Sequence, residues 1–260
     1  FRMTESLSLG SSILEDFANS PSILVALDFD GTLAPLVDDP ETSRMTPEAR
    51  EALEALTLLD GVTIALVSGR AIESLMRVAE PMKQWFLVGS HGIEVLSPGE
   101  AKGYVTPWLV PTGLEEGFRA VVSTHQGTRL EMKPFGVALH TRGVEEAIAR
   151  DAEAEVMRVC DAWDGELVVR RGHGIVECSI KDSNKGDGIS ALIAQTGTPT
   201  VLFAGDDVTD EDGFAVLKPT DVSIRVGGGD TRARFRVVDT TEMAAILWRV
   251  YESRTIQAVK

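Results

Sequence analysis

The chain has 260 residues, of which 43 % are hydrophobic and 25 % charged, a composition that suits a globular protein with a sizeable buried core. The formal net charge of -15 disfavours nucleic acid and anionic membranes as partners, because no basic run is present to neutralise phosphate groups. No apolar run approaches the roughly 18 residues that cross a bilayer, so a membrane protein is not expected.

Two further features restrict the class of protein. The first ten residues contain no basic segment followed by an apolar one, so the sequence predicts no secretory signal and a cytoplasmic location. Cys160 and Cys178 belong to no Cys-x-x-Cys motif or Cys/His cluster, which argues against zinc and redox chemistry and predicts reduced thiols.

The first part of the chain predicts alternating helices and strands. An amphipathic helix is expected over 4–19, and the continuous apolar run 23–27 predicts a buried parallel strand. Helices are expected from Pro47, which follows a Thr46 N-cap, to about residue 59, and over 71–79; strands are expected over 62–67 and 85–88. This alternation is typical of an open parallel sheet with helices on both faces.

After Gly103 the pattern changes and predicts an inserted α+β domain. Helices are expected over 114–124 and 144–163, and strands over 128–133, 137–142, 167–171 and 175–180, with the second hairpin turning at Gly172-His173-Gly174. The order predicts a small antiparallel sheet with helices on one face.

From Gly186 the first pattern returns, with helices to about 195, over 210–217 and over 241–251, and strands over 200–204 and 222–226. The predicted class is therefore α/β, a Rossmann-like core with a parallel sheet plus an inserted α+β cap domain. The predicted domains are 1–104 and 183–260 for the core and 105–182 for the cap.

Acidic residues follow two of the predicted core strands. Asp28 and Asp30 come directly after the first strand, and alternation along an extended chain would send both side chains to one side, where a cation is needed between them. Asp206, Asp207 and Asp210 follow a later strand in a segment rich in carboxylates. Because ligands bind at the carboxyl ends of such strands, we expect a Mg²⁺ site with Asp206 as a ligand, while Asp207 and Asp210 hold its waters or orient a lysine.

Hydrogen-bond donors follow other predicted strands and loops. Ser68, Gly69 and Arg70 come after the second core strand, and Lys185 comes after the second hairpin. A hydroxyl, adjacent backbone N–H groups and an ammonium would together bind phosphate oxygens. Each feature is common by itself, so it is their order along the chain with the two acidic motifs that indicates a phosphate site.

The four motifs in this order resemble those of the haloacid-dehalogenase-like phosphatase superfamily. The resemblance implies that Asp28 is the nucleophile, that Asp30 protonates the leaving group and later activates water, and that Ser68 and Lys185 hold the phosphoryl group. It also implies a Mg²⁺ ion held by Asp28, the backbone carbonyl of Asp30 and Asp206.

Charged residues of the predicted inserted domain suggest the substrate. Glu131 and Lys133 alternate onto one strand face, which suits a polyhydroxylated ligand but equally suits a salt-bridged solvent face. The pattern formed with His140, Arg142 and Glu177 resembles trehalose-6-phosphate phosphatases. The resemblance implies that Glu131, Lys133 and Glu177 bind the distal glucose and that Arg142 and His140 lie near the phosphate or support the pocket.

The expected function is hydrolysis of a small sugar phosphate, trehalose 6-phosphate, by a monomer that binds neither nucleic acid nor membranes. Another sugar phosphatase or a phosphomutase, acting on sucrose 6-phosphate or a hexose phosphate, would share the core residues and differ in the inserted domain. A non-catalytic sugar-phosphate sensor is the alternative from a different class, and intact core motifs argue against it.

Overall fold

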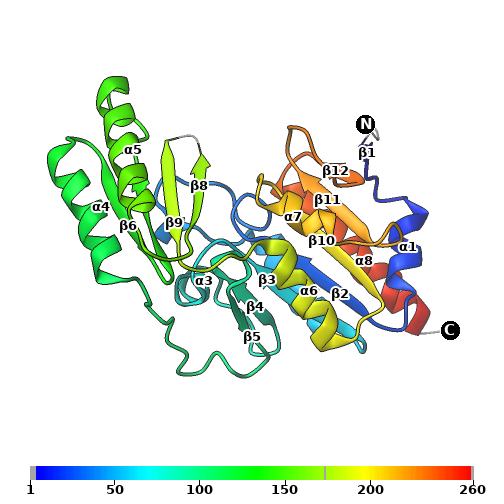
Figure 1. The fold of residues 1–260 in the computed structure, drawn as a ribbon. Coiled ribbons are helices and arrows are strands. Elements are labelled where there is room, and N and C mark those ends of the chain that lie inside the picture. Colours follow the sequence, from blue (N-terminus) through cyan, green and yellow to red (C-terminus); the bar gives the residue numbers. More distant parts are fainter. Residues whose placement is uncertain (1–3, 173, 259–260) are drawn as a thin grey trace. The chain divides into compact units, whose positions relative to one another are not determined.

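The computed structural model describes residues 4–172 and 174–258 (Figure 1). The chain divides into two compact units, Phe1–Tyr104 with Ser183–Lys260, and Val105–Asp182. We call them the larger and the smaller unit. The larger unit is built from two stretches of sequence that the smaller unit separates.

An eight-stranded sheet forms the centre of the larger unit, in the order β1-β12-β11-β10-β2-β3-β4-β5. Neighbouring strands run parallel, except β4 and β5, which are antiparallel. The strands are β1 (Glu5–Ser6), β2 (Ile23–Leu27), β3 (Val62–Val67), β4 (Phe86–Gly89), β5 (Glu94–Leu96), β10 (Thr200–Gly205), β11 (Val222–Val226) and β12 (Phe235–Val237). All five residues of the central strand β2 are buried, as expected for a strand covered on both faces.

Helices cover both faces of this sheet. One apolar cluster joins the sheet to α1 (Ser12–Ala18), α2 (Pro47–Thr57), α3 (Ile72–Ala79) and α8 (Thr240–Ala258), and a second joins the opposite face to α6 (Lys185–Thr196) and α7 (Asp210–Ala215). Short 3₁₀ turns occupy Pro40–Thr42 and Ser90–Gly92. In the part of the chain that is described, no helix combines the length and the apolar character that a bilayer crossing requires. The predicted α/β class with a mainly parallel sheet is confirmed.

Side-chain caps fix where two of the helices begin. The Thr46 hydroxyl accepts a hydrogen bond from the Ala49 N–H, with Pro47 at the first helical position. Asn184 and Asp187 form a reciprocal capping box at the start of α6. The second cap places Lys185 in the first turn of its helix.

The sequence prediction fails at the edges of the sheet. The helix expected over 4–19 begins only at Ser12, because Glu5–Ser6 pairs with β12 instead. The strands β5 and β12 were not predicted. Both have only three residues, too few for an alternating apolar pattern to be recognised.

The smaller unit is an antiparallel sheet in the order β6-β7-β9-β8 with two helices on one face. Its elements are α4 (Thr112–Thr124), β6 (Arg129–Lys133), β7 (Gly136–His140), α5 (Glu146–Asp161), β8 (Val168–Gly172) and β9 (Ile175–Ser179). The turn predicted between β8 and β9 includes His173, which lies outside the described residues. Cys160 and Cys178 are free thiols buried in the core of this unit.

Candidate active site

The strand order brings three of the predicted motifs to one edge of the large sheet. Strand β2 lies between β10 and β3, and Asp28, Asp206 and Ser68 follow the carboxyl ends of these three strands. The Asp28 N–H donates to the Ala204 carbonyl of β10 at 2.9 Å, which continues the sheet pairing up to the motif. Residues far apart in sequence thus meet because their strands are direct neighbours.

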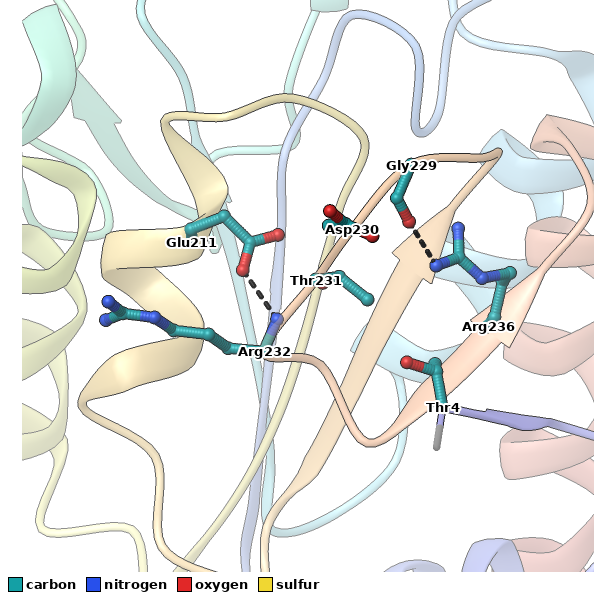
Figure 2. A pocket seen from close by; sticks show the side chains of 7 residues that line it. All are labelled: Thr4, Glu211, Gly229, Asp230, Thr231, Arg232 and Arg236. Atoms are coloured by element: carbon teal, nitrogen blue, oxygen red, sulfur yellow. Dashed lines mark hydrogen bonds between the residues drawn. The ribbon is translucent and has the colours of Figure 1, made fainter. Parts of the chain in front are cut away.

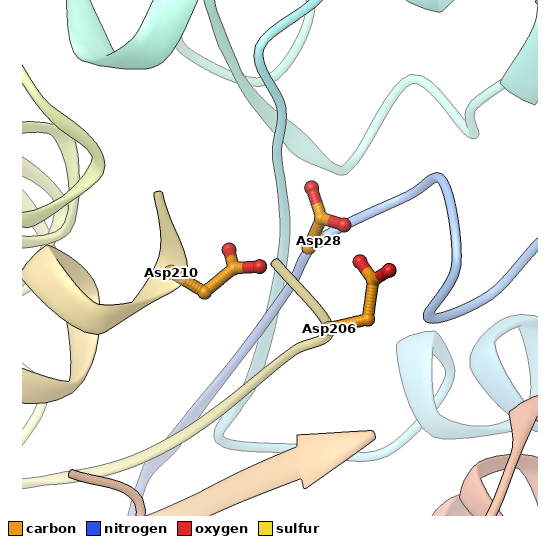
Figure 3. Close-up of side chains that lie close together, drawn as sticks. All are labelled: Asp28, Asp206 and Asp210. Atoms are coloured by element: carbon orange, nitrogen blue, oxygen red, sulfur yellow. The ribbon is translucent and has the colours of Figure 1, made fainter. Parts of the chain in front are cut away.

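Three carboxylates form a cluster at this edge. One oxygen each of Asp28, Asp206 and Asp210 lies within 4.8 Å of the others (Figure 3). Asp28 is 4 % exposed and Asp210 is fully buried, so water screens their charges poorly. An arrangement of this kind requires compensating positive charge.

Lys185 supplies part of that charge. Its Nζ atom lies 2.7 Å from Asp28 Oδ1 and 2.7 Å from Asp210 Oδ1, and the residue is 3 % exposed. The second oxygen of Asp210 accepts from the Asp207 N–H at 2.9 Å. Asp210 therefore binds the lysine through Oδ1 and the Asp207 backbone through Oδ2, so both of its oxygens are occupied.

The pKa shifts indicate that Lys185 balances the negative charge of the three carboxylates only in part. Burial, together with the charges of Asp210 and Asp206, raises the pKa of Asp28 well above its ordinary value despite the attraction of Lys185. Burial and the charge of Asp210 raise the pKa of Asp206 to about 6. Burial lowers the pKa of Lys185, but the carboxylates of Asp28 and Asp210 outweigh this effect and leave it raised. The cluster thus has an excess of negative charge.

The residues fit a divalent cation between Asp28 and Asp206. One oxygen of each carboxyl group lies within 4.8 Å of the other, a separation that a shared cation can span. Asp206 packs against Gly31, where a Cβ atom would lie 2.0 Å from Asp206 Oδ2, so only glycine leaves room for this carboxylate. Asp210 is a poorer ligand than its proximity suggests, because Lys185 and the Asp207 N–H already occupy its oxygens.

The Asp30 side chain does not join this cluster, contrary to the expectation that it faces Asp28 across a cation. Its carboxylate forms a two-point ion pair with Arg70, with Nε to Oδ2 at 2.6 Å and Nη2 to Oδ1 at 2.8 Å. The Ser43 hydroxyl donates to Oδ1 at 2.9 Å. The chain turns after β2, so the alternation of an extended strand does not continue to Asp30. Ser43 was missed because nothing near it in the sequence marks its role.

The Ser68-Gly69-Arg70 turn takes on two separate roles. The Ser68 hydroxyl is buried and accepts from the Arg70 N–H at 3.1 Å. The Arg70 guanidinium donates to Asp30 and to the Pro40 carbonyl, so it is occupied within the protein rather than directed to phosphate. Asp207 is exposed, and its side chain accepts from the Val208 N–H at 2.7 Å.

The loop that contains Ser90 and His91 has a strained backbone and packs against the turn at Gly69. Ser90 and His91 both have left-handed backbone angles, with φ of 48° and 54°, which non-glycine residues rarely adopt. The His91 ring packs against Gly69, where a Cβ atom would meet it at 2.5 Å. Glu94 is buried and accepts from the Ile72 N–H and the Ser90 hydroxyl. His91 thus packs against the motif that carries Ser68.

The polar residues predicted to bind sugar lie on strands of the smaller unit. Lys133 Nζ lies 2.5 Å from Glu177 Oε2, and His140 Nε2 lies 2.7 Å from Glu131 Oε2. Arg142 follows β7 and is exposed. The structure therefore brings four of the five residues together as two pairs.

A pocket of about 440 Å³ lies elsewhere on the larger unit (Figure 2). Its lining residues are Thr4, Glu211, Gly229, Asp230, Thr231, Arg232 and Arg236. Glu211 accepts from the Arg232 N–H at 2.7 Å, and Arg236 donates to the Gly229 carbonyl at 2.6 Å. No predicted site residue lines this pocket, although Glu211 directly follows Asp210 in α7.

Comparison with known proteins places this arrangement in a family. The family model described as trehalose-phosphatase matches residues 26–244, well over half of the chain. The chain belongs to the trehalose-phosphatase family. The predicted resemblance is thereby confirmed, and the matched range includes both the carboxylate cluster and the whole smaller unit.

Trehalose-phosphatase relatives in several organisms match most of the chain. It is 28 % identical to a trehalose-6-phosphate phosphatase of Escherichia coli, over 83 % of this chain and 82 % of that protein. It is 32 % identical to a trehalose-phosphate phosphatase of Mycobacterium marinum, over 88 % of this chain and 62 % of that protein. A bifunctional trehalose-6-phosphate synthase/phosphatase of Thermoproteus tenax is 32 % identical over 95 % of this chain, which spans only 34 % of that longer protein.

Solved structures of trehalose-6-phosphate phosphatases share the fold. The C-terminal domain of the C. albicans protein matches with a TM-score of 0.76 at 20 % identity, covering 96 % of this chain and 98 % of that one. The Aspergillus fumigatus protein matches with a TM-score of 0.70 at 22 % identity, covering 96 % and 100 %. The predicted haloacid-dehalogenase-like fold is thus confirmed.

In this trehalose-phosphatase family member, Arg70→Lys is expected to lower kcat about 10- to 100-fold while KM changes little. Lysine keeps the positive charge but cannot form the two-point pair that fixes the Asp30 carboxylate. Steady-state phosphate release measures both constants. Arg77→Lys, which alters an exposed arginine of α3, is the matched control and should behave as wild type. A raised KM with unchanged kcat would instead make Arg70 a substrate ligand.

Proposed function

We propose that this chain is a Mg²⁺-dependent phosphatase that hydrolyses trehalose 6-phosphate to trehalose and inorganic phosphate through an aspartyl-phosphate on Asp28. The observation that carries the proposal is the position of Asp28. It is buried at a strand end, bonded to Lys185 and adjacent to Asp206, so a nucleophile, a fixed positive charge and a cation ligand are present together.

The first half of the proposed reaction transfers the phosphoryl group to Asp28. One Asp28 oxygen forms a bond to phosphorus while the bond from phosphorus to the sugar oxygen breaks, and Asp30 gives a proton to that oxygen. Lys185 offsets the repulsion between the phosphate dianion and the attacking carboxylate. When Mg²⁺ is bound by Asp28 and Asp206, it supplies further positive charge for the same purpose.

The second half releases phosphate. Asp30 takes a proton from a water molecule whose oxygen attacks phosphorus, and the bond from phosphorus to Asp28 breaks. The two-point contact with Arg70 and the hydrogen bond from the Ser43 hydroxyl fix the position of the Asp30 carboxylate for this proton transfer.

The Ser68 hydroxyl and the neighbouring backbone N–H groups are proposed to bind the remaining phosphate oxygens. Ser68 follows β3, the strand beside β2, and its hydroxyl is held in place by the Arg70 N–H. Fixed donors of this kind need no reorganisation when negative charge moves in the reaction.

We propose that the smaller unit is the cap domain and recognises the sugar. Its polar sheet face carries Glu131, Lys133, His140 and Glu177, which together supply hydrogen-bond acceptors and donors for sugar hydroxyls. The similarity to the trehalose-6-phosphate phosphatase of Escherichia coli and the trehalose-phosphate phosphatase of Mycobacterium marinum supports trehalose 6-phosphate as the substrate. Monomeric state, cytoplasmic location and the absence of nucleic-acid or membrane partners stay predictions from the sequence.

The test is phosphate release from trehalose 6-phosphate, sucrose 6-phosphate and mannose 6-phosphate, each with Mg²⁺ and with EDTA. We expect kcat/KM to favour trehalose 6-phosphate by at least about 100-fold, because a site built for specific hydroxyls rejects sugars that leave its polar groups unpaired. EDTA should abolish the activity. Comparable rates on all three sugars, or full activity in EDTA, would contradict the proposal.

A further inference from the structure

On the face of the smaller unit's sheet that carries no helix, the side chains of neighbouring strands are aligned in rows. Strand pairing aligns Glu131 with Ala138 and Ala138 with Glu177, so these three side chains form one row across β6, β7 and β9. The next row contains Lys133 and Gly136. Directly paired residues project from the same face, and the alternate residues of β7 and β9 pack against α4 and α5. These rows therefore lie on the opposite face.

The ion pair between Lys133 and Glu177 crosses an entire strand. Lys133 is on β6 and Glu177 is on β9, and β7 lies between them. Two strand spacings separate their backbones by roughly 9 to 10 Å. The 2.5 Å contact between Nζ and Oε2 therefore requires the lysine side chain to pass over β7.

Strand β7 presents only the smallest side chains where this bridge crosses it. Gly136 has no room for a side chain, because a Cβ atom there would lie 2.1 Å from the Cys178 carbonyl oxygen. Ala138 lies directly between Glu131 and Glu177 in its row and is fully buried. A branched side chain at residue 138 would occupy the path of the lysine.

The bridge holds a donor and an acceptor side by side. The Lys133 and Glu177 side chains are 21 % and 14 % exposed, so the pair is largely shielded from water but still accessible to a ligand. Glu131 lies at the β6 end of the row that contains Glu177, and its partner His140 lies in the neighbouring row, opposite Arg129. An adjacent ammonium and carboxylate match two neighbouring hydroxyls of a sugar ring, one accepting and one donating.

We propose that Gly136 and Ala138 are positioning residues for sugar recognition. Their small size lets Lys133 reach Glu177 across β7, and the resulting bridge is a preformed pair that reads adjacent hydroxyls of the sugar. The inference rests on the proposed function, since it concerns how the same enzyme selects its sugar phosphate.

The test compares two substrates in variants that change the size of residue 138. Ala138→Val should lower kcat/KM for trehalose 6-phosphate about 10- to 100-fold, the loss expected for hydrogen bonds that involve charged groups. Hydrolysis of p-nitrophenyl phosphate, which has no sugar hydroxyls, should stay within about twofold of wild type. Ala138→Gly should keep both activities, because it leaves the path of the lysine open.

Ala147→Val is the matched control, because it makes the same change at an exposed position of α5. It should change neither activity. Ala138→Ser makes a smaller change and serves as a second test if valine lowers the thermal stability of the smaller unit. Its kcat/KM for trehalose 6-phosphate should lie between those of wild type and Ala138→Val. The expected order of selectivity for trehalose 6-phosphate is Gly and Ala first, then Ser, then Val.

The outcomes separate this inference from the proposed function. A wild-type protein that hydrolyses trehalose 6-phosphate, but whose selectivity survives Ala138→Val, would overturn the inference alone. Equal losses on both substrates would also overturn it. Wild-type hydrolysis of p-nitrophenyl phosphate without hydrolysis of trehalose 6-phosphate would reject the proposed function, and this assignment of the sheet face with it.

Discussion

Asp28→Asn is expected to lower kcat for trehalose 6-phosphate by at least about 10,000-fold while the protein remains folded. Asparagine has nearly the same shape as aspartate, but its neutral amide cannot form the acyl phosphate that the proposed reaction passes through. Phosphate release under single-turnover and steady-state conditions measures the loss. Asp212→Asn removes an exposed carboxylate of α7 and should retain wild-type activity.

In the absence of metal, Asp28→Asn should be at least as stable as wild type, and we expect its free energy of unfolding to be higher by up to about 2 kcal/mol. Asp28 is buried beside two other carboxylates, so its neutralisation removes repulsion and a desolvation cost. Lys185 keeps its partner Asp210 in this variant. Urea unfolding in EDTA measures the difference. A marked loss of stability would show that Asp28 has a structural role, and retained turnover would remove it as the nucleophile.

Lys185→Met is expected to lower both the stability and the activity of the protein. It removes an ammonium group that is bonded to both Asp28 and Asp210, so the unfolding free energy should fall by about 3 to 5 kcal/mol, the cost of an uncompensated buried charge. kcat should fall by at least about 1,000-fold, because the positive charge that balances the phosphate is lost. Urea unfolding and phosphate release measure the two effects.

Two comparisons identify the cause of this loss. Lys218→Met changes an exposed lysine and should leave both quantities close to wild type. Adding Asp210→Asn to Lys185→Met should recover part of the lost stability, because it removes one of the two unpaired carboxylates. Strictly additive losses would show that the two side chains are not energetically coupled.

The sequence indicated the central strands of the core because they are largely apolar runs. The runs at 23–27 and 200–204 became neighbouring strands, and acidic residues that directly follow neighbouring strands must meet. Asp28 and Asp206 could thus be brought together by argument from the sequence. The orientation of Lys185 by Asp210 was also within reach, because both follow strands or loops that lead to the same sheet edge.

Side-chain contacts between residues far apart in the sequence could not be predicted. Arg70 lies far from Asp30 in sequence, and whether an arginine binds phosphate or a neighbouring carboxylate depends on a turn whose geometry no local pattern fixes. The crossing of β7 by the bridge from Lys133 to Glu177 depends on strand order, because β9 rather than β8 pairs with β7 in the sheet. Strand β1 has two residues and carries no periodic signal.

The most direct test is a crystal structure of the protein grown with Mg²⁺ and beryllium fluoride, a mimic of a phosphoryl group bound to a carboxylate. We expect beryllium bonded to an Asp28 oxygen, with Lys185 beside the fluorides and a cation shared by Asp28 and Asp206. Beryllium on another side chain, or a cation held away from both aspartates, would contradict the account.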